Sequence, residues 1–72
     1  MHEIHVAVVS AEEAADGTAE LWSGGRMIGF THLEDGDLML RIEPRHDGTP
    51  LVVQVRSLTA ALAEVGRVLA VA

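Results

Sequence analysis

The sequence predicts an α+β fold in which a five-stranded antiparallel β-meander is followed by one C-terminal α-helix packed on one face of the sheet. Three observations predict it. Apolar residues alternate with period two through most of the chain up to Arg56, short Gly- or Asp-rich links separate the alternating segments, and the last segment changes to helical spacing. Short links favour antiparallel neighbours in sequence order. We expect residues 1–72 to form a single small domain.

The first strand is predicted over residues 3–9, where every second side chain is apolar. Ser10 then stands three residues before Glu13, which is the spacing of a capping box. Residues 11–15 therefore form either one helical turn, ended by Asp16-Gly17, or a polar loop. The side chains of the strand that face the core are Ile4, Val6 and Val8.

A β-hairpin is predicted where residues 18–23 and 26–33 flank Gly24-Gly25. Two linking glycines suit the positive φ angles of a primed turn. This turn fixes which side chains lie opposite one another on each face of the hairpin. The expected pairs are Leu21 with Ile28 and Ala19 with Phe30 on the core face, and Trp22 with Met27 and Glu20 with Gly29 on the outer face.

The turn over residues 34–37 tests that register. A two-residue loop here would pair Phe30 with Arg41, and would place a charge among the apolar side chains. A three-residue loop, Glu34–Gly36, pairs Phe30 with Leu40 instead. We predict the three-residue loop, because a slip of one residue turns a whole apolar set toward water.

The last part of the chain is predicted to hold two further strands and the helix. The fourth strand covers residues 37–43, and the composition of residues 44–50 indicates a loop. The fifth strand covers residues 51–56, and Ser57 is the expected N-cap of the helix. The apolar stripe of this helix consists of Leu58, Leu62, Val65 and Leu69.

Composition excludes several classes of protein. The chain has 72 residues, no cysteine and a formal net charge of −6. Without thiols it can form neither a disulfide nor a thiolate metal site. The acidic balance argues against nucleic acid or an anionic membrane as a partner, since both require clustered basic residues. No apolar run approaches the roughly 20 residues of a membrane span.

Residue usage without Lys, Asn or Tyr is typical of a GC-rich bacterial genome, and we expect a cytoplasmic protein.

The residues that carry chemistry lack the spacing that each chemistry needs. The four histidines do not converge on one strand face, so we predict no metal site. Acidic residues cluster in predicted turns and lack the alternating order of a calcium loop. Ser23 has none of the surroundings of a nucleophile, and the glycines form no phosphate-binding motif. We therefore predict no catalytic residue and no cofactor.

The outer face of the sheet carries the main functional signal. One helix covers only one face, so large apolar side chains on the other face lie exposed in a monomer. We predict that this face is an interaction surface, in which Glu20 and Arg41 form a polar pair across Gly29. The predicted interface residues are Trp22, Met27, Met39, Val52 and Leu33.

Chain length gives a second argument for association. A chain of this size buries only about 60% of the surface that its unfolded form exposes, which is a marginal basis for stability without a disulfide or a metal. We expect a non-enzymatic domain that forms a homodimer and acts as a protein–protein interaction module, with a protein of basic surface as a further partner class. Two alternatives stay open. One is a small-molecule-binding protein or minor enzyme with a pocket between helix and sheet or at a dimer interface; the other is an oligomer that responds to pH through its histidines.

Overall fold

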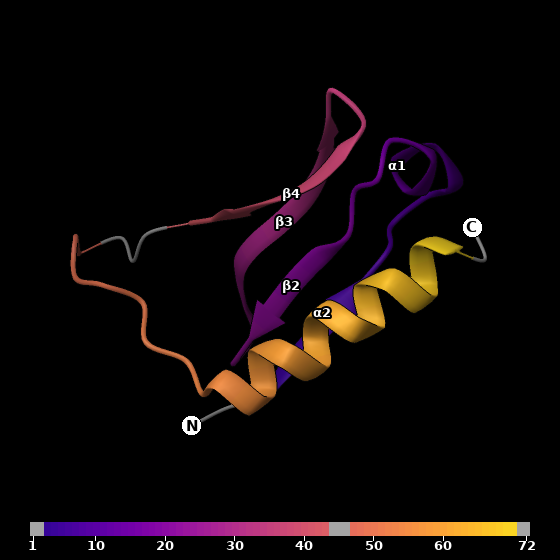
Figure 1. Ribbon diagram of the computed structural model, residues 1–72. Coiled ribbons are helices and arrows are strands. Elements are labelled where there is room, and N and C mark those ends of the chain that lie inside the picture. Colours follow the sequence, from indigo (N-terminus) through magenta and orange to yellow (C-terminus); the bar gives the residue numbers. More distant parts are fainter. Residues whose placement is uncertain (1–2, 44–46, 71–72) are drawn as a thin grey trace.

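A computed structural model describes residues 3–43 and 47–70 of the chain (Figure 1). The strands form one antiparallel sheet in the order β1-β2-β3-β4, and a helix follows them. The α+β class, the antiparallel sheet and the C-terminal helix are therefore confirmed. The elements are β1 (Ile4–Ala7), α1 (Ala11–Ala15), β2 (Glu20–Ser23), β3 (Arg26–Glu34), β4 (Asp37–Ile42) and α2 (Val55–Ala70).

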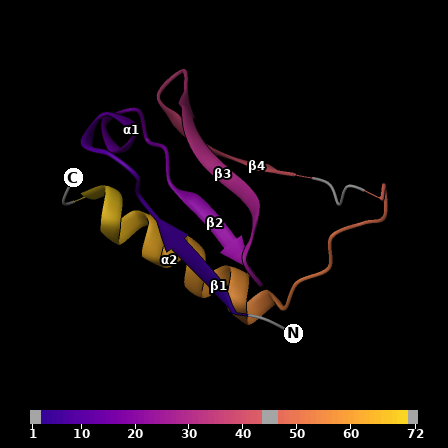
Figure 2. The same ribbon diagram turned by 180° about the vertical axis from the view of Figure 1, so that it is seen from behind.

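Helix α2 lies against one face of the sheet, which we call the inner face (Figures 1 and 2). Its contacts with the strands are concentrated on β1, at one edge of the sheet. The β3–β4 hairpin extends away from the helix (Figure 1). The helix therefore covers one side of the inner face and leaves the β4 side without a helix. The buried core consists of Ala19, Leu21, Ile28, Ala61 and Val65.

Residues 11–15 form the helical turn, so that alternative is confirmed. Ser10 has an extended backbone (φ −150°, ψ 163°), and its Oγ accepts a hydrogen bond from the backbone N–H of Glu13 at 3.1 Å. This N-cap satisfies one of the donors that a helix leaves unpaired at its start. Asp16 follows the last helical residue, and its N–H bonds back to carbonyls of α1. The cap therefore fixes how the chain leaves β1.

The turn between β2 and β3 forms as predicted. Gly24 and Gly25 have φ angles of +61° and +77°, the positive values that a primed two-residue turn requires. Trp22 lies opposite Met27 next to this turn. The glycine pair and the first large cross-strand pair of the hairpin could therefore be read from the sequence.

A β-bulge beyond this pair changes the predicted register. Leu21 lies opposite Gly29 and Glu20 lies opposite Phe30, so Ile28 is an extra residue on β3. The predicted pairing of Leu21 with Ile28 and of Glu20 with Gly29 is therefore wrong, as is the placing of Phe30 on the core face. Both Leu21 and Ile28 are still buried, because the bulged residue keeps its side chain on the inner face.

Gly29 permits the close approach of β3 and β4 next to the bulge. A Cβ atom at this position would lie 2.5 Å from the carbonyl oxygen of Arg41 and 3.3 Å from Cα of Ile42. A distance of 2.5 Å to a backbone atom is too short for any side chain. Glycine inside a strand often marks such a contact or a bulge, and here it marks both.

The turn between β3 and β4 has two residues, so the predicted three-residue loop is wrong. Asp35 and Gly36 have φ angles of +53° and +84°, and Phe30 lies opposite Arg41. The longer loop was expected in order to keep a charge away from a buried Phe30. The bulge removes that reason, because it turns Phe30 to the outer face, where a charged neighbour remains hydrated.

The fifth strand that was predicted over residues 51–56 does not form. Residues 51–54 are irregular, and α2 begins at Val55. Leu51 and Val53 pack against the core while Val52 is 73% exposed. The apolar alternation therefore marks the buried side of a connecting segment, which packs over the inner face and does not extend the sheet.

Helix α2 starts earlier than the sequence predicts. Its first turn is closed by a hydrogen bond from the Leu58 N–H to the Gln54 carbonyl at 3.1 Å. Gln54 therefore holds the N-cap position that was predicted for Ser57. The Ser57 hydroxyl lies inside the first turn and donates to Gln54 Oε1 at 3.3 Å. Ser57 therefore contacts the side chain of the N-cap residue and is not the N-cap itself.

Thr31 joins β3 to the segment that leads from α1 into β2. Its side chain is 2% exposed. The Thr31 hydroxyl donates to the Gly17 carbonyl at 2.6 Å and accepts from the Ala19 N–H at 2.9 Å. One buried hydroxyl thus satisfies two backbone groups and fixes the start of β2 against the centre of the sheet.

Candidate interaction surface

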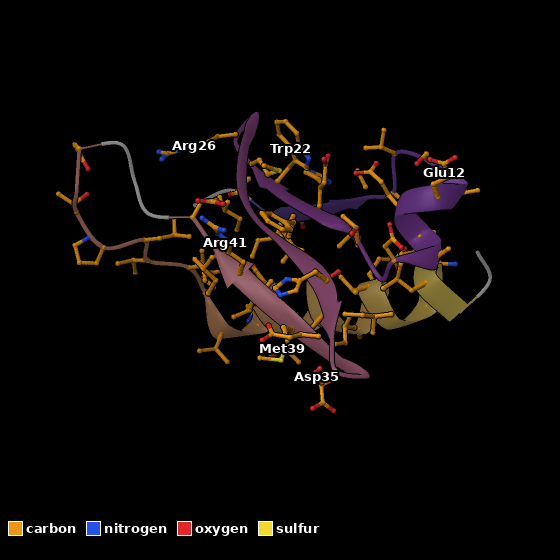
Figure 3. All side chains as sticks on the ribbon, turned by 90° about the horizontal axis from the view of Figure 1, so that it is seen from above. Glu12, Trp22, Arg26, Asp35, Met39 and Arg41 are labelled. Atoms are coloured by element: carbon orange, nitrogen blue, oxygen red, sulfur yellow. The ribbon has the colours of Figure 1, made fainter. Side chains whose placement is uncertain are left out.

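Two of the predicted interface residues, Trp22 and Met27, lie side by side on the outer face. Trp22 pairs with Met27 of β3 on one side and with His5 of β1 on the other. Both side chains are half-buried, and the Trp22 indole N–H donates to Glu20 Oε1 at 3.1 Å. Met39 lies on the same face, opposite His32. Figure 3 shows it well apart from Trp22.

Leu33 and Val52, the other predicted interface residues, lie elsewhere. Leu33 follows His32 in β3, so its side chain lies on the inner face, opposite Leu38. A Cβ atom on Gly17 would lie 2.6 Å from Cγ of Leu33, which shows that Leu33 packs beside the end of α1. Val52 lies in the irregular segment before α2. The five predicted residues therefore do not form one continuous patch.

Glu20 and Arg41 lie in one row across the outer face, with Phe30 between them. Glu20 accepts the hydrogen bond from the Trp22 indole. Arg41 Nε lies 3.2 Å from Oε1 of Glu43. The structure therefore places an aromatic ring, and not the expected glycine, between these two charged residues, and it gives each of them a different partner.

The structure exposes a further set of apolar side chains, which we call the β4 edge surface. Helix α2 covers the β1 side of the sheet, so the inner face of β4 lacks a cover of the same kind. Neither Leu38 nor Ile42 was predicted as a surface residue, because apolar alternation in a strand does not show which part of a sheet face stays uncovered. Its four members are Leu33 (50% exposed), Leu38 (47%) and Ile42 (54%) on the inner face, and Met39 (44%) on the outer face of the same hairpin.

One sequence feature bears on this exposure. Of the apolar stripe predicted for α2, Val65 is buried and Leu58 and Leu69 pack against the core, whereas Leu62 is 42% exposed. Which strands stay uncovered depends on where the connecting segment places the helix.

Comparisons with protein-family models, curated proteins and solved structures found no match.

A hollow lies between the sheet and the segment that precedes α2. Its volume is about 20 Å³, far below the several hundred Å³ typical of small-molecule sites. The hollow is lined by Leu21, Ile28, Gly29, Leu40, Ile42, Leu51, Val53 and Leu58. With this size and lining, it continues the apolar inner face and does not resemble a ligand pocket.

A wider depression of about 280 Å³ lies where β1 meets the first turn of α2. Its lining is mixed and consists of Glu3, Ile4, Arg56, Ser57 and Ala60. His32 lines neither depression. Its Nε2 lies 3.4 Å from Oε2 of Glu34, and both side chains are partly exposed.

The part of the chain that the structure describes contains no group of three or more His, Asp or Glu side chains placed to hold a metal ion. His2 and His46, two of the four histidines considered for such a site, lie outside the described residues. Within residues 3–43 and 47–70, no helix has the length and apolarity needed to cross a membrane.

Proposed function

We propose that this chain is a non-enzymatic protein-interaction domain that self-associates as a homodimer through the β4 edge surface. The observation that supports this is the exposure of Leu33, Leu38, Met39 and Ile42 on one hairpin at the end of the sheet. Contiguous exposed apolar side chains mark interaction sites in soluble proteins. An uncovered edge strand adds unpaired backbone groups that another chain can bind.

Association also accounts for the incomplete cover of the inner face. In a domain this small, apolar area left in water removes a large share of the net stability. The described residues expose 4999 Å², and a standard interface of about 800 Å² on each partner covers about a sixth of that area. A partner at β4 removes part of the apolar area of these side chains from water.

The proposal is tested by the solution mass of the purified chain and of three variants at micromolar concentration. We expect the unaltered chain to sediment as a dimer, and the Leu38→Glu variant to sediment as a folded monomer, because a charge there cannot be buried in an apolar interface. Val9→Glu is the matched control, since Val9 is 66% exposed and lies away from β4. Circular dichroism checks that each variant is folded.

The Trp22→Ala variant separates the two candidate surfaces. If the β4 edge surface is the interface, this variant stays a dimer. Dissociation of Trp22→Ala together with an unchanged Leu38→Glu dimer would move the interface to the outer face. A monomeric unaltered chain at these concentrations would overturn the proposal.

A further inference from the structure

The sequence of β4 is self-complementary. Residues 38–40 are Leu-Met-Leu, which is the same in both directions, and the residues that flank them, Asp37 and Arg41, have opposite charges. In an antiparallel pair of identical strands, a two-fold axis places each residue opposite its mirror position in the partner. An axis at Met39 therefore brings apolar residues together at the centre and opposite charges together on both sides.

The backbone of β4 leaves one row of hydrogen-bonding groups for such a partner. The Glu43 N–H donates to the Ile28 carbonyl at 2.8 Å. Because bonding alternates along an antiparallel strand, Arg41 and Met39 also direct their N–H and C=O groups toward β3. Leu38 and Leu40, with Ile42, direct theirs away from β3. Among the described strands β4 has a neighbour on one side only, so this row faces outward.

We infer that β4 pairs antiparallel with β4 of a second copy of this chain, with the two-fold axis at Met39, so that the two sheets become continuous. The inference rests on the proposed function and names the partner, the strand and the register. Leu38 exchanges backbone hydrogen bonds with the partner's Leu40, and symmetry repeats this pair. Met39 faces the partner's Met39 in a position without backbone hydrogen bonds, and Asp37 faces the partner's Arg41.

Charge selects this register over its neighbours. The outward row permits shifts of the axis by one residue, to Leu38 or Leu40, and by two residues, to Arg41. An axis at Leu38 places Asp37 opposite the partner's Met39 and leaves it without a charged partner. An axis at Leu40 places Asp37 opposite the partner's Glu43, and an axis at Arg41 places two arginines opposite each other. Opposite charges directly across a strand pair stabilise it, and like charges destabilise it. The axis at Met39 alone gives two pairs of opposite charge within residues 37–41.

The side chain of Arg41 is placed to make this contact on the outer face. Its Nε lies 3.2 Å from Oε1 of Glu43, and its guanidinium group lies over Phe30. A guanidinium group has five N–H donors, so these contacts leave donors for a second carboxylate. Asp37 and Arg41 are both exposed, so pairing across the axis does not bury an unpartnered charge.

Disulfide trapping tests the register directly, because the chain has no cysteine and each variant introduces a single thiol. Across the axis, non-bonded pairs have Cα atoms about 4.5 Å apart, within the range that a disulfide spans. We expect the Met39→Cys variant to form a covalent dimer under mild oxidation much faster than Leu40→Cys or Arg41→Cys, the central positions of two alternative registers. Val9→Cys gives the rate of random collision.

Charge reversal provides a second arm. Asp37→Arg and Arg41→Asp each place like charges across the axis twice, and we expect each to raise the dimer Kd by about tenfold. The double variant restores opposite charges, and its Kd returns toward that of the unaltered chain. Sedimentation across a range of concentrations measures all four.

The outcomes separate this inference from the proposed function. A monomeric unaltered chain overturns both. A dimer in which Leu40→Cys or Arg41→Cys forms the covalent species fastest overturns the register. A dimer in which every β4 variant reacts at the rate of Val9→Cys overturns pairing at this strand and leaves self-association in place.

Discussion

The guanidinium carbon of Arg41 lies 5.9 Å from the centroid of the Phe30 ring on the outer face of the sheet. Phe30 and Arg41 lie directly opposite each other on β3 and β4. The ring also lies 6.2 Å from the imidazole of His32, measured between centroids, with the planes tilted by 51°. A cation–π contact between partly exposed groups stabilises a fold only modestly. This contact lies beside the edge of the sheet, because Arg41 belongs to β4.

A double-mutant cycle measures this contact. We expect Phe30→Leu and Arg41→Met to show a coupling free energy of about 0.5–1 kcal/mol in urea unfolding, the range of exposed cation–π pairs. The cycle cancels the effect of each substitution on the rest of the molecule. Arg56 lies in α2, so the cycle of Phe30→Leu with Arg56→Met is the control, with a coupling of zero. Equal coupling in both cycles would show that the cation does not interact with the ring.

The buried hydroxyl of Thr31 gives a second prediction. Thr31→Val has nearly the same shape but leaves the Ala19 N–H and the Gly17 carbonyl without their partner. We expect it to lower the free energy of unfolding by about 1–3 kcal/mol, the cost of an unsatisfied buried polar group.

Thr31→Ser is the matched control for this prediction. It keeps both hydrogen bonds and removes one methyl group, which costs about 0.8 kcal/mol. Urea unfolding followed by circular dichroism ranks the two variants. A Ser variant less stable than the Val variant would mean that packing of the methyl group, and not the hydrogen bonds, explains why Thr31 is buried.

Two glycines in different surroundings give opposite predictions for the same substitution. Gly29→Ala places a Cβ atom 2.5 Å from a backbone oxygen of β4, so the two strands must separate and stability falls. Gly66→Ala introduces a methyl group that meets no atom within 4 Å. We expect it to raise the free energy of unfolding by about 0.5–1 kcal/mol, because alanine favours a helix.

Thermal unfolding of the two variants, side by side, measures this difference. A lower melting temperature for Gly29→Ala and a higher one for Gly66→Ala are expected. If Gly66→Ala is destabilising instead, the side of α2 that carries Gly66 must pack closely against a second molecule, and the partner in the dimer is the first candidate.

The ion pair on α2 predicts a pH dependence. The pKa of Glu64 is lowered from its usual 4.5, chiefly because the Arg67 guanidinium donates hydrogen bonds to the carboxylate. The folded-state pKa is thus below the unfolded one, so the pair adds stability at pH values above 4.5 and loses it as pH falls through the folded value. Both groups are exposed, so the effect on stability is small.

Carboxyl chemical shifts measured during a pH titration check this prediction. We expect the Glu64 midpoint to lie below 4.5 in the unaltered chain and to move up toward 4.5 in the Arg67→Met variant. An identical midpoint in the two proteins would mean that the guanidinium does not hold the carboxylate in solution.

Local signals in the sequence predicted local structure well. The Ser10 cap, the Gly24-Gly25 turn and the pairing of Trp22 with Met27 each depend on residues within a few positions of one another. The bulge at Ile28 was missed because apolar alternation does not distinguish an extra residue from a continuous strand. Gly29 was the available signal, since glycine inside a strand indicates a bulge or a close approach.

The error in the β3–β4 turn followed from the missed bulge. The Asp35-Gly36 pair is itself a strong signal for a two-residue primed turn. It was set aside in favour of a register that kept Phe30 buried, which the bulge made unnecessary. Local patterns in the sequence did not show where α2 and the segment before it lie on the sheet. The irregular path of residues 51–54 and the uncovered side of β4 both depend on that position.

The position of α2 against β1 also bears on the order in which the chain folds. The three strands from β2 to β4 are joined by turns of two residues each, so their contacts form at a small cost in chain entropy. The contact between β1 and α2 closes a loop that contains the whole meander, and such closures slow folding. We expect the hairpins to form early with their leucines exposed, and docking of α2 to complete the core last.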